Sequence, residues 1–480
     1  MCKKPYCVYG TGVLCILVLV AGIVMILLQV FPNILYSQVK EVTVLKNGSQ
    51  TFDIWQNPPA PVYMQYYFFN LTNPAEVLDG DKPAVVEIGP YTYREYRPMT
   101  DVEFLENGTK VAALNPKTYV FERNMSIGSE DDLIRTVNIP AATVMQKYKD
   151  SIFGSVISTI MTGEKTGLFE VHRVGDLLWG YEDRLLKALK AFEPSLDDHF
   201  GLFYMMNATD DGAYTFYSGS ENYQDFTRVA EWKGQRSLNW WSTDECNMIN
   251  GTIGASFHAV ITKQETLYLF SSDLCRSLYA RFEKEVWVKN VPGYRFVPPS
   301  EVFANVTVNP ANAGFCVPAG NCLSSGLLNV SVCKQDAPII LSPPHFYQTD
   351  EKFVQDIFGM RPNKENHETR IDINPLTGYV IQAAKRMQVN VFLEKISKFR
   401  QTGDIRTLVF PVMYLNESVV IDDDSAEKLQ AAVTQGNIVI NIPFIIIGLG
   451  ILLGVVFMVL ISRKRIPEST PDERKPLLTS

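Results

Sequence analysis

Two long apolar stretches, one near each end of the chain, constrain the fold more than any other feature. They read CVYGTGVLCILVLVAGIVMILLQVF at 7–31 and NIVINIPFIIIGLGILLGVVFMVLIS at 437–462, and neither contains Asp, Glu, Lys or Arg. A helix needs about 20 apolar residues to cross a bilayer. A buried core helix is a poor alternative at this length, and a cleaved signal peptide has a shorter apolar run of about 7–15 residues. The sequence therefore predicts two transmembrane helices, the first of them an uncleaved signal anchor.

Basic residues flank both stretches on their outer sides: Lys3, Lys4, Arg463, Lys464 and Arg465. Because Lys and Arg are enriched on the cytosolic side of membrane helices, the tails 1–6 and 463–480 are predicted to be cytosolic. Residues 32–436 then form one glycosylated domain in the lumen. Gly450 and Gly454 have the spacing that lets membrane helices approach closely. Glycine is common in such helices, so we prefer the ordinary interpretation and leave a homodimer open.

Glycosylation sequons support the same orientation. All Asn-x-Ser/Thr motifs fall between the two stretches, at Asn47, Asn70, Asn107, Asn124, Asn207, Asn250, Asn305, Asn329 and Asn416. A dense set confined to one predicted compartment is much stronger evidence than a single sequon. We therefore expect these positions to lie at the surface of the lumenal domain.

The cysteines divide between the first apolar stretch and the domain. Cys2 and Cys7 lie beside the membrane, where S-acylation and plain thiols are equally good interpretations. Five further cysteines lie in the domain, at Cys246, Cys275, Cys316, Cys322 and Cys333. An oxidising lumen favours disulfides, and the spacing fits no zinc template. One of the five must stay unpaired, and spacing alone does not identify it.

Short runs rich in aromatic and β-branched residues, separated by turn signals, predict a sheet-rich domain. The region 141–192 differs, because apolar residues recur there at helical spacing in two segments. These residues are Val144, Tyr148, Ile152, Val156, Leu178, Tyr181, Leu185 and Leu189. Such helices either dock on a partner or pack onto the β-rich body, and the sequence alone favours neither.

Catalytic and metal-binding motifs are missing from the sequence. It has no G-x-S-x-G, H-E-x-x-H or phosphate-binding loop, and its five histidines show no ligand spacing. An enzyme is therefore a minority interpretation, and we predict no metal or cofactor. The formal net charge of −8 argues against a nucleic-acid partner. His172, just before the second helical segment, is the candidate for a pH switch, although an ordinary surface histidine is a common alternative.

The C-terminal tail carries an acidic residue followed by two leucines, at Glu473, Leu477 and Leu478. Because this tail follows a membrane helix and is short, we expect a partner protein to bind it in an extended conformation. The pattern resembles the acidic dileucine sorting signal, which clathrin adaptor complexes bind in proteins destined for endosomes and lysosomes.

Several longer motifs resemble the class B scavenger receptor family over nearly the whole chain. They are EIGPYTYREYR, LIRTVNIP, LLWGYED, NAGFCVPAGNC, INPLTG and TGDIRTLVFPVMYLNES. The resemblance implies a large, irregular antiparallel β-barrel with an apical helical bundle. It also implies an internal hydrophobic tunnel that binds cholesterol or phospholipid and passes it toward membrane lipids. Family pairing would join Cys275 to Cys333 and Cys316 to Cys322, leaving Cys246 free.

The tail is most similar to that of the lysosomal member of this family. That resemblance implies a lysosomal or late endosomal membrane location and a receptor for β-glucocerebrosidase. The receptor would bind the enzyme through its apical helices, carry it from the endoplasmic reticulum and release it in acid. Lipid transport through the tunnel is the alternative function. One departure is Ser151, which stands where the lysosomal member has a pH-sensing histidine, so His172 or another mechanism would have to replace it.

Overall fold

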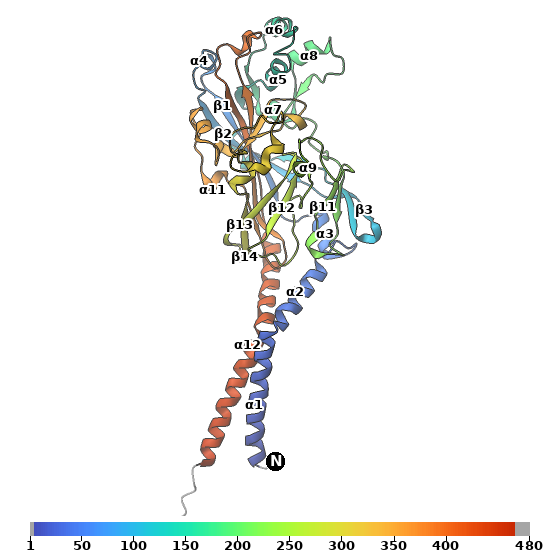
Figure 1. Ribbon diagram of the computed structural model, residues 1–480, viewed down its shortest axis with the longest axis vertical. Coiled ribbons are helices and arrows are strands. Elements are labelled where there is room, and N and C mark those ends of the chain that lie inside the picture. Colours follow the sequence, from blue (N-terminus) through green and yellow to red (C-terminus); the bar gives the residue numbers. More distant parts are fainter. Residues whose placement is uncertain (1–3, 466–480) are drawn as a thin grey trace, which may run out of the picture. The chain divides into compact units, whose positions relative to one another are not determined.

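The structure, a computed structural model, describes residues 4–465 and the side chains of residues 8–462 (Figure 1). The chain divides into two compact units. The first, made of Met1–Val39 and Leu429–Ser480, is here called the helical unit, and the second, Lys40–Lys428, is called the sheet unit.

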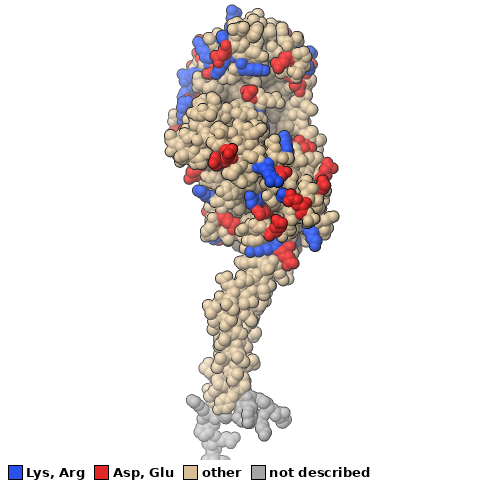
Figure 2. All heavy atoms as spheres, turned by 45° about the vertical axis from the view of Figure 1, so that its right-hand side comes forward, with Lys and Arg blue, Asp and Glu red and all other residues tan. Residues whose placement is uncertain are grey.

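Three helices build or enter the helical unit: α1 (Lys4–Leu27), α2 (Val30–Val42) and α12 (Asp423–Arg465). Val8–Leu27 of α1 and most of α12 are long and apolar enough to cross a membrane. The visible face of this unit shows no Lys, Arg, Asp or Glu among its described residues, whereas charges of both signs cover the sheet unit (Figure 2). The predicted first span, 7–31, is divided between α1 and α2, because Gln29 adopts a positive φ of 48°.

Close packing between α1 and α12 uses the glycines noted in the sequence. A Cβ placed at Gly450 would lie 2.7 Å from Leu19 Cδ2, and one at Gly454 would lie 3.2 Å from Cys15 Sγ. The Cys15 thiol donates a hydrogen bond to the Gly450 carbonyl oxygen at 3.2 Å. Small residues allow membrane helices this approach. The glycine face that left a homodimer open therefore contacts a helix of the same chain.

An 11-stranded antiparallel sheet forms the body of the sheet unit. Its path is β12 (Thr266–Ser271), β13 (Arg276–Val288), β14 (Val291–Val297), β17 (Arg370–Ile373), β18 (Val380–Leu393), β19 (Leu408–Val420), β1 (Val62–Leu71), β2 (Val85–Tyr96) and β5 (Thr118–Phe121). A branch from β18 adds β16 (Ile339–Ser342) and β15 (Leu328–Asn329). Aromatic and β-branched residues alternate between buried and partly exposed positions along β1, as expected for a strand with one face on the core.

Smaller elements surround this sheet. A four-stranded sheet contains β11 (Val229–Trp232), β10 (Tyr214–Tyr217), β4 (Lys110–Leu114) and β3 (Thr100–Leu105). Two pairs join β6 (Leu133–Val137) to β7 (Phe169–Arg173) and β8 (Tyr181–Glu182) to β9 (His199–Phe200). The remaining α-helices are α3 (Gln50–Gln56), α4 (Pro74–Leu78), α5 (Ile139–Lys147), α6 (Gly154–Gly163), α7 (Val174–Trp179), α8 (Arg184–Lys190), α9 (Asp244–Asn247), α10 (Glu351–Gln355) and α11 (Lys364–His367).

The expected β-barrel is not closed by hydrogen bonds in the described part of the chain. The end strands β12 and β5 do not pair with each other, so the large sheet has two free ends. β3 and β4, which lie between β2 and β5 in sequence, join the separate four-stranded sheet instead. The large antiparallel sheet is therefore confirmed, whereas the hydrophobic tunnel stays a prediction.

The two predicted helical segments of 141–192 are each broken. The first divides into α5 and α6 around a turn at 148–153, and the second divides into α7 and α8. Gly180 causes the second break, because it adopts a φ of 120° and a Cβ there would lie 2.5 Å from Tyr204 Cδ2. Asp183 then starts α8 by accepting a hydrogen bond from the Leu186 backbone N–H at 2.9 Å.

Both disulfides implied by the family resemblance are present in the sheet unit. Cys275 is bonded to Cys333, and Cys316 is bonded to Cys322. Cys246 is a free, buried thiol, as the same resemblance implies. Among the described side chains, the cross-links therefore lie between residues 275 and 333.

A cluster of charged side chains links β2, β18 and β19. Arg97 forms an ion pair with Glu417, and Lys385 lies 2.6 Å from Asp273 and 3.5 Å from Glu417. Burial alone would raise the pKa of Glu417, but Lys385 and Arg97 lower it to about 2. Burial, with Glu417 nearby, raises the pKa of Glu95, whose carboxylate oxygens have no hydrogen-bond partner. The pKa values of the two carboxyl groups are therefore shifted in opposite directions, although Arg97 lies 3.9 Å from Glu95 as well.

Two buried histidines hold the segment around α11 against the sheet. His345 and His367 stack with ring centroids 4.5 Å apart. Each Nδ1 accepts a backbone N–H, from Arg361 at 3.0 Å and from Asn363 at 2.9 Å. An imidazole that gains a proton at Nδ1 can no longer accept there. Protonation of either ring would therefore break a hydrogen bond that holds this segment.

The charged surroundings of this pair come from several strands. His345 Nε2 lies 2.6 Å from a carboxylate oxygen of Glu87, which also accepts a bond from the Tyr414 hydroxyl. Burial and the neighbouring His345 lower the pKa of His367 to about 4, and Arg386 acts in the same direction. The folded chain thus keeps His367 neutral in mild acid.

We predict that Gly454→Cys forms an intrachain disulfide with Cys15, because the new Cβ lies 3.2 Å from that sulfur. A protease site placed in the exposed loop between α8 and β9 would separate the halves of the oxidised full-length chain, since both native disulfides follow it. A non-reducing gel should keep the halves joined for Gly454→Cys and release them for Gly448→Cys, which has no neighbour within 4 Å. Cross-linked dimers in place of joined halves would show that the glycines pair two chains.

We further predict that His367→Asn flattens the acid dependence of stability. The unfolded chain protonates His367 below about pH 6.5, so its contribution is complete above that pH and is lost as the pH falls toward about 4. The full loss is about 3 kcal/mol. Asn retains an acceptor for the Asn363 N–H but does not titrate. The melting temperature of the full-length protein in detergent, followed from pH 7.5 to 4.5, measures the slope.

His258→Asn is the matched control for this prediction. Both ring nitrogens of His258 face acceptors, the Ala259 carbonyl oxygen at 2.9 Å and Glu265 at 3.1 Å, so protonation there breaks no bond. In the His258→Asn variant, the melting temperature should fall with decreasing pH as steeply as in the wild type. Equal slopes for wild type and His367→Asn would contradict the assignment.

Candidate functional site

Helix α6 is attached to the end of the sheet unit through one buried face. Ile157, Ser158 and Met161 form this face. The Ser158 hydroxyl donates to Gln401 Oε1 at 2.9 Å, and Gln401 Nε2 donates back to the Ser158 carbonyl oxygen at 3.0 Å. These reciprocal bonds fix the rotation of α6 about its axis, and they therefore determine which residues of the helix face outward.

The outward face carries an exposed apolar surface, here called the apical patch and made of Ile152, Phe153 and Val156. Their exposed fractions are 86%, 58% and 56%. Helix α8 lies at the same end of the sheet unit as α6 (Figure 1), and Phe192, which follows α8, is 76% exposed. Soluble surfaces rarely expose adjoining large apolar side chains unless they bind a partner. The patch is therefore the candidate site for a protein ligand.

Three of the eight residues predicted to bind a partner are too buried to reach one, whereas binding by the other five stays a prediction. Val144, Leu178 and Leu185 are buried in the main core. Three others, Tyr148, Tyr181 and Leu189, are half-buried. The correction has a simple cause: helical periodicity detects the stripe of a helix that faces the core, and the core is where most such stripes lie. Ile152 and Val156 alone of the eight are exposed.

Sequence reasoning did not identify Phe153 and Phe192 as surface residues. Phe153 stands outside the helical stripe because it follows Ile152 directly, in the turn before α6. Phe192 lies just beyond the end of α8. Both are apolar residues that lie outside the periodic stripe of their helical segment. A residue outside the core-facing stripe points away from the core, so this position is the signal that could have identified them.

Ion pairs border the apical patch. Lys149 lies 3.0 Å from Glu394, and Lys147 lies 3.9 Å from Glu193, next to Phe192. Lys398 donates to the Ser151 carbonyl oxygen at 3.1 Å. Exposed pairs of this kind contribute little stability but can orient a charged partner. Ser151 itself lies in the turn before α6, beside the patch.

His172 lies on β7, outside α5 and α6. Its Nε2 is 3.2 Å from Glu170 Oε2, and its ring stacks on Tyr181 with centroids 4.1 Å apart. Burial alone would raise the pKa of Glu170, but the hydrogen bond with His172 lowers it. Burial also raises the pKa of the nearby Asp183 carboxyl group. His172 thus lies between two carboxyl groups and an aromatic ring.

Metal-ligating side chains gather at one place in the described residues, where Asp197, Asp198 and His199 come together. Asp198 lies 3.1 Å from Lys190, whose ammonium already neutralises it, and His199 Nδ1 lies 3.0 Å from the same carboxylate. This arrangement is an exposed ion-pair cluster, and we assign it no ligand.

The predicted glycosylation positions all lie outside the core. Asn47, Asn107, Asn124 and Asn207 are exposed. The other positions are partly exposed: Asn70, Asn250, Asn305, Asn329 and Asn416. Their occupancy stays a prediction. The sorting residues Glu473, Leu477 and Leu478, together with Cys2, lie outside the described residues.

Comparison with known proteins places this architecture in a family. A family model described as the CD36 family matches residues 13–461. Lysosome membrane protein 2 of Homo sapiens is 49% identical over 475 residues, which are 98% of this chain and 99% of that protein. The Rattus norvegicus protein of the same name shows the same identity and coverage. Scavenger receptor class B member 1 of Bos taurus is 34% identical, over 87% of this chain and 81% of that protein.

These similarities extend through both terminal helices and the whole sheet unit. Relatives in this family are named as membrane proteins and receptors rather than as enzymes. Together with the two apolar helices, they identify a lysosomal membrane protein with a membrane-spanning segment near each end. The chain belongs to the CD36 family of class B scavenger receptors.

Proposed function

We propose that this chain is a lysosomal receptor that binds β-glucocerebrosidase through the apical patch and releases it in acid. The tail motif at Glu473, Leu477 and Leu478 would direct the loaded receptor from the secretory pathway to the lysosome through clathrin adaptors. One observation carries the proposal. Val156 on α6 and Ile152 and Phe153 in the preceding turn are exposed, while the opposite face of α6 is held by Ser158 and Gln401.

The form of the patch supports a protein ligand over a small molecule. It is convex, because it lies on the outer face of a helix and the preceding turn, and it has paired charges beside it. Apolar side chains in the centre with a polar rim are typical of protein interfaces. His172, on β7, contacts Glu170 and stays the candidate residue for the response to acid.

We predict that Ile152→Asp or Phe153→Ser lowers the affinity for β-glucocerebrosidase at neutral pH by at least about tenfold, since each removes an exposed apolar anchor. Val308→Asp is the matched control, because Val308 is equally apolar and exposed but follows β14 far from α6 in sequence. Biolayer interferometry with the full-length receptor in nanodiscs, at pH 7 and pH 5, measures the affinity. Unchanged melting temperatures would show that the variants fold.

The same measurement tests release in acid. If His172 is the switch, His172→Gln should retain binding at pH 5, because Gln keeps a polar contact with Glu170 but gains no proton. Loss of binding in acid by both wild type and His172→Gln would exclude this residue. Absence of binding at either pH would contradict the receptor proposal as a whole.

A second candidate function, lipid binding and transport, is supported by unpartnered polar groups inside the sheet unit. The Tyr66 hydroxyl and both Glu95 carboxylate oxygens are buried without a hydrogen-bond partner among the described residues, and the nearest cation to Glu95 is Arg97 at 3.9 Å. Buried polar groups are normally satisfied. A sterol hydroxyl or a phospholipid carbonyl would supply the missing partner, and transport through an interior path would follow.

We predict that the purified full-length protein carries sterol or phospholipid through detergent exchange. Glu95→Gln should reduce the retained amount, since it alters an unpartnered group, and Glu106→Gln on the exposed surface should not. Mass spectrometry of the extracted lipids, against an unrelated membrane protein purified in parallel, gives the comparison. Lipid content equal to that background would exclude this candidate.

A further inference from the structure

Arg276, at the start of β13, is a buried cation without a counter-charge. Its side chain and backbone together are 5% exposed. Among the described residues its guanidinium makes one hydrogen bond, from Nε to the Ser277 carbonyl oxygen at 3.2 Å, and no ion pair. A guanidinium has five N–H donors, and a buried charge is costly unless it is paired. Most of its donors are therefore unaccounted for.

Aromatic rings compensate one face of this cation. The guanidinium carbon lies 3.5 Å from the centre of the Phe315 ring and 5.5 Å from that of Phe303. A desolvated cation–π contact of this kind contributes about 2 kcal/mol. The donors of a guanidinium point outward within its own plane. Stacking on a face therefore leaves the Nη donors free at the edge.

A small cavity of about 30 Å³ lies beside Arg276. Its walls include Phe303, Phe315, Leu327 and the Cys316–Cys322 disulfide, and Arg276 is the one charged residue that lines it. A single water needs about 10–15 Å³ of such volume, so this space admits a small group of a few heavy atoms. The cavity thus combines an unused planar donor edge with room for a small group.

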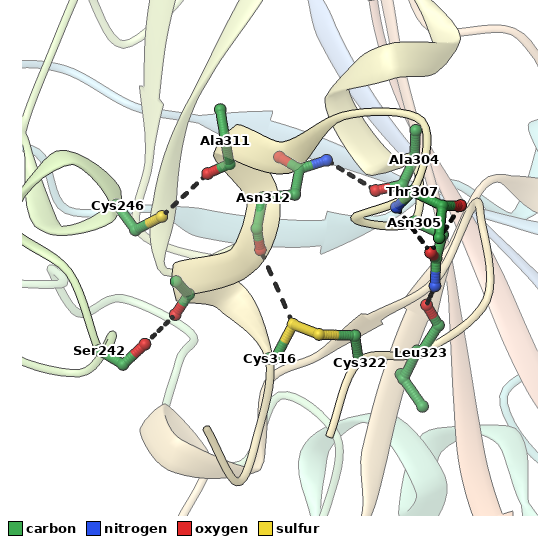
Figure 3. The surroundings of a disulfide bond; sticks show 11 residues. Ser242, Cys246, Ala304, Asn305, Thr307, Ala311, Asn312, Cys316, Cys322 and Leu323 are labelled. Atoms are coloured by element: carbon green, nitrogen blue, oxygen red, sulfur yellow. Dashed lines mark hydrogen bonds between the residues drawn. A yellow bond between two sulfur atoms is a disulfide. The ribbon is translucent and has the colours of Figure 1, made fainter. Parts of the chain in front are cut away.

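Hydrogen bonds hold the walls of this cavity in place (Figure 3). Asn312 Nδ2 donates to the carbonyl oxygens of Ala304 and Glu301, at 2.8 and 3.1 Å. Asn305 Nδ2 donates to the Leu323 carbonyl oxygen at 2.7 Å. These amide donors are already occupied by the chain. Arg276 therefore provides the unassigned donors of a preformed site.

We propose that the Arg276 cavity binds a small planar oxyanion, of the size of acetate or bicarbonate. A carboxylate matches the guanidinium edge with two parallel hydrogen bonds, and it supplies the negative charge that the site lacks. The volume excludes sugars and nucleotides. Burial, with no carboxylate nearby, lowers the pKa of Arg276 to about 9, which leaves it cationic at neutral and acidic pH.

The test is anion-dependent stability of the full-length protein in detergent. Sodium acetate is added in increasing amounts. The sodium salt of a sulfonate that is too bulky to enter the cavity replaces it at lower acetate concentrations, so that the ionic strength stays constant. We expect a saturable rise in melting temperature of about 2 °C or more, because a ligand that binds the folded state stabilises it. Sodium chloride, whose anion is spherical, should give a smaller rise in melting temperature. A rise that is larger with chloride than with acetate would overturn the planar assignment.

Variants separate this site from general salt effects. Arg276→Met keeps the stacking volume but removes the donors and should abolish the response, and Arg276→Lys keeps the charge but loses the planar edge and should weaken it at least fivefold. Arg228→Met, at a half-exposed arginine paired with Asp225, should respond like wild type. Hydrogen exchange of peptides covering 303–329 should slow with acetate in wild type. Equal acetate responses in wild type and Arg276→Met would overturn the proposal.

Discussion

Pairing between the first and last long strands holds the sheet unit together. β1 lies between β2, its neighbour in sequence, and β19, whose residues are more than 340 positions away, with Val62 opposite Val419 and Phe68 opposite Met413. Closing so long a loop costs chain entropy before any contact compensates it. The apical helices and the Arg276 cavity are both inserted between these strands in sequence. The geometry of both regions therefore depends on the pairing of β1 with β19, in which neither region takes part.

Polar groups whose hydrogen bonding is incomplete recur inside this sheet unit. Tyr66 and Glu95 lie on β1 and β2, and Arg276 begins β13. The same sheet elsewhere satisfies a buried charge completely, since Arg295 bonds to both oxygens of Asp372 at 2.7 Å. This pair shows that the sheet can satisfy a buried charge from within the chain. Buried polar groups with incomplete hydrogen bonding therefore mark places where another molecule would supply the missing partner. The apical patch follows the same reasoning for apolar groups.

Sequence reasoning succeeded where one local property decides the outcome. Long charge-free stretches gave the terminal helices, aromatic-rich runs gave strands, and family motifs gave the disulfide pairs. It failed where residues distant in sequence determine the local structure. Helical spacing could not show that Leu178 faces the core while Phe153 faces solvent. No local pattern could bring Glu87 to His345, which is 258 residues away, or place Phe315 over Arg276.

The position of the disulfides has a consequence for survival among proteases. Both disulfides of the described residues lie between residues 275 and 333, so neither joins the part of the chain that carries α5 to α8 to the part that follows. A lysosomal protease that cuts the exposed loop after α8 would produce two polypeptides. The strand pairing of β1 with β19 and the glycine contact between α1 and α12 would still hold them together. A nicked receptor would thus persist as a non-covalent two-chain molecule.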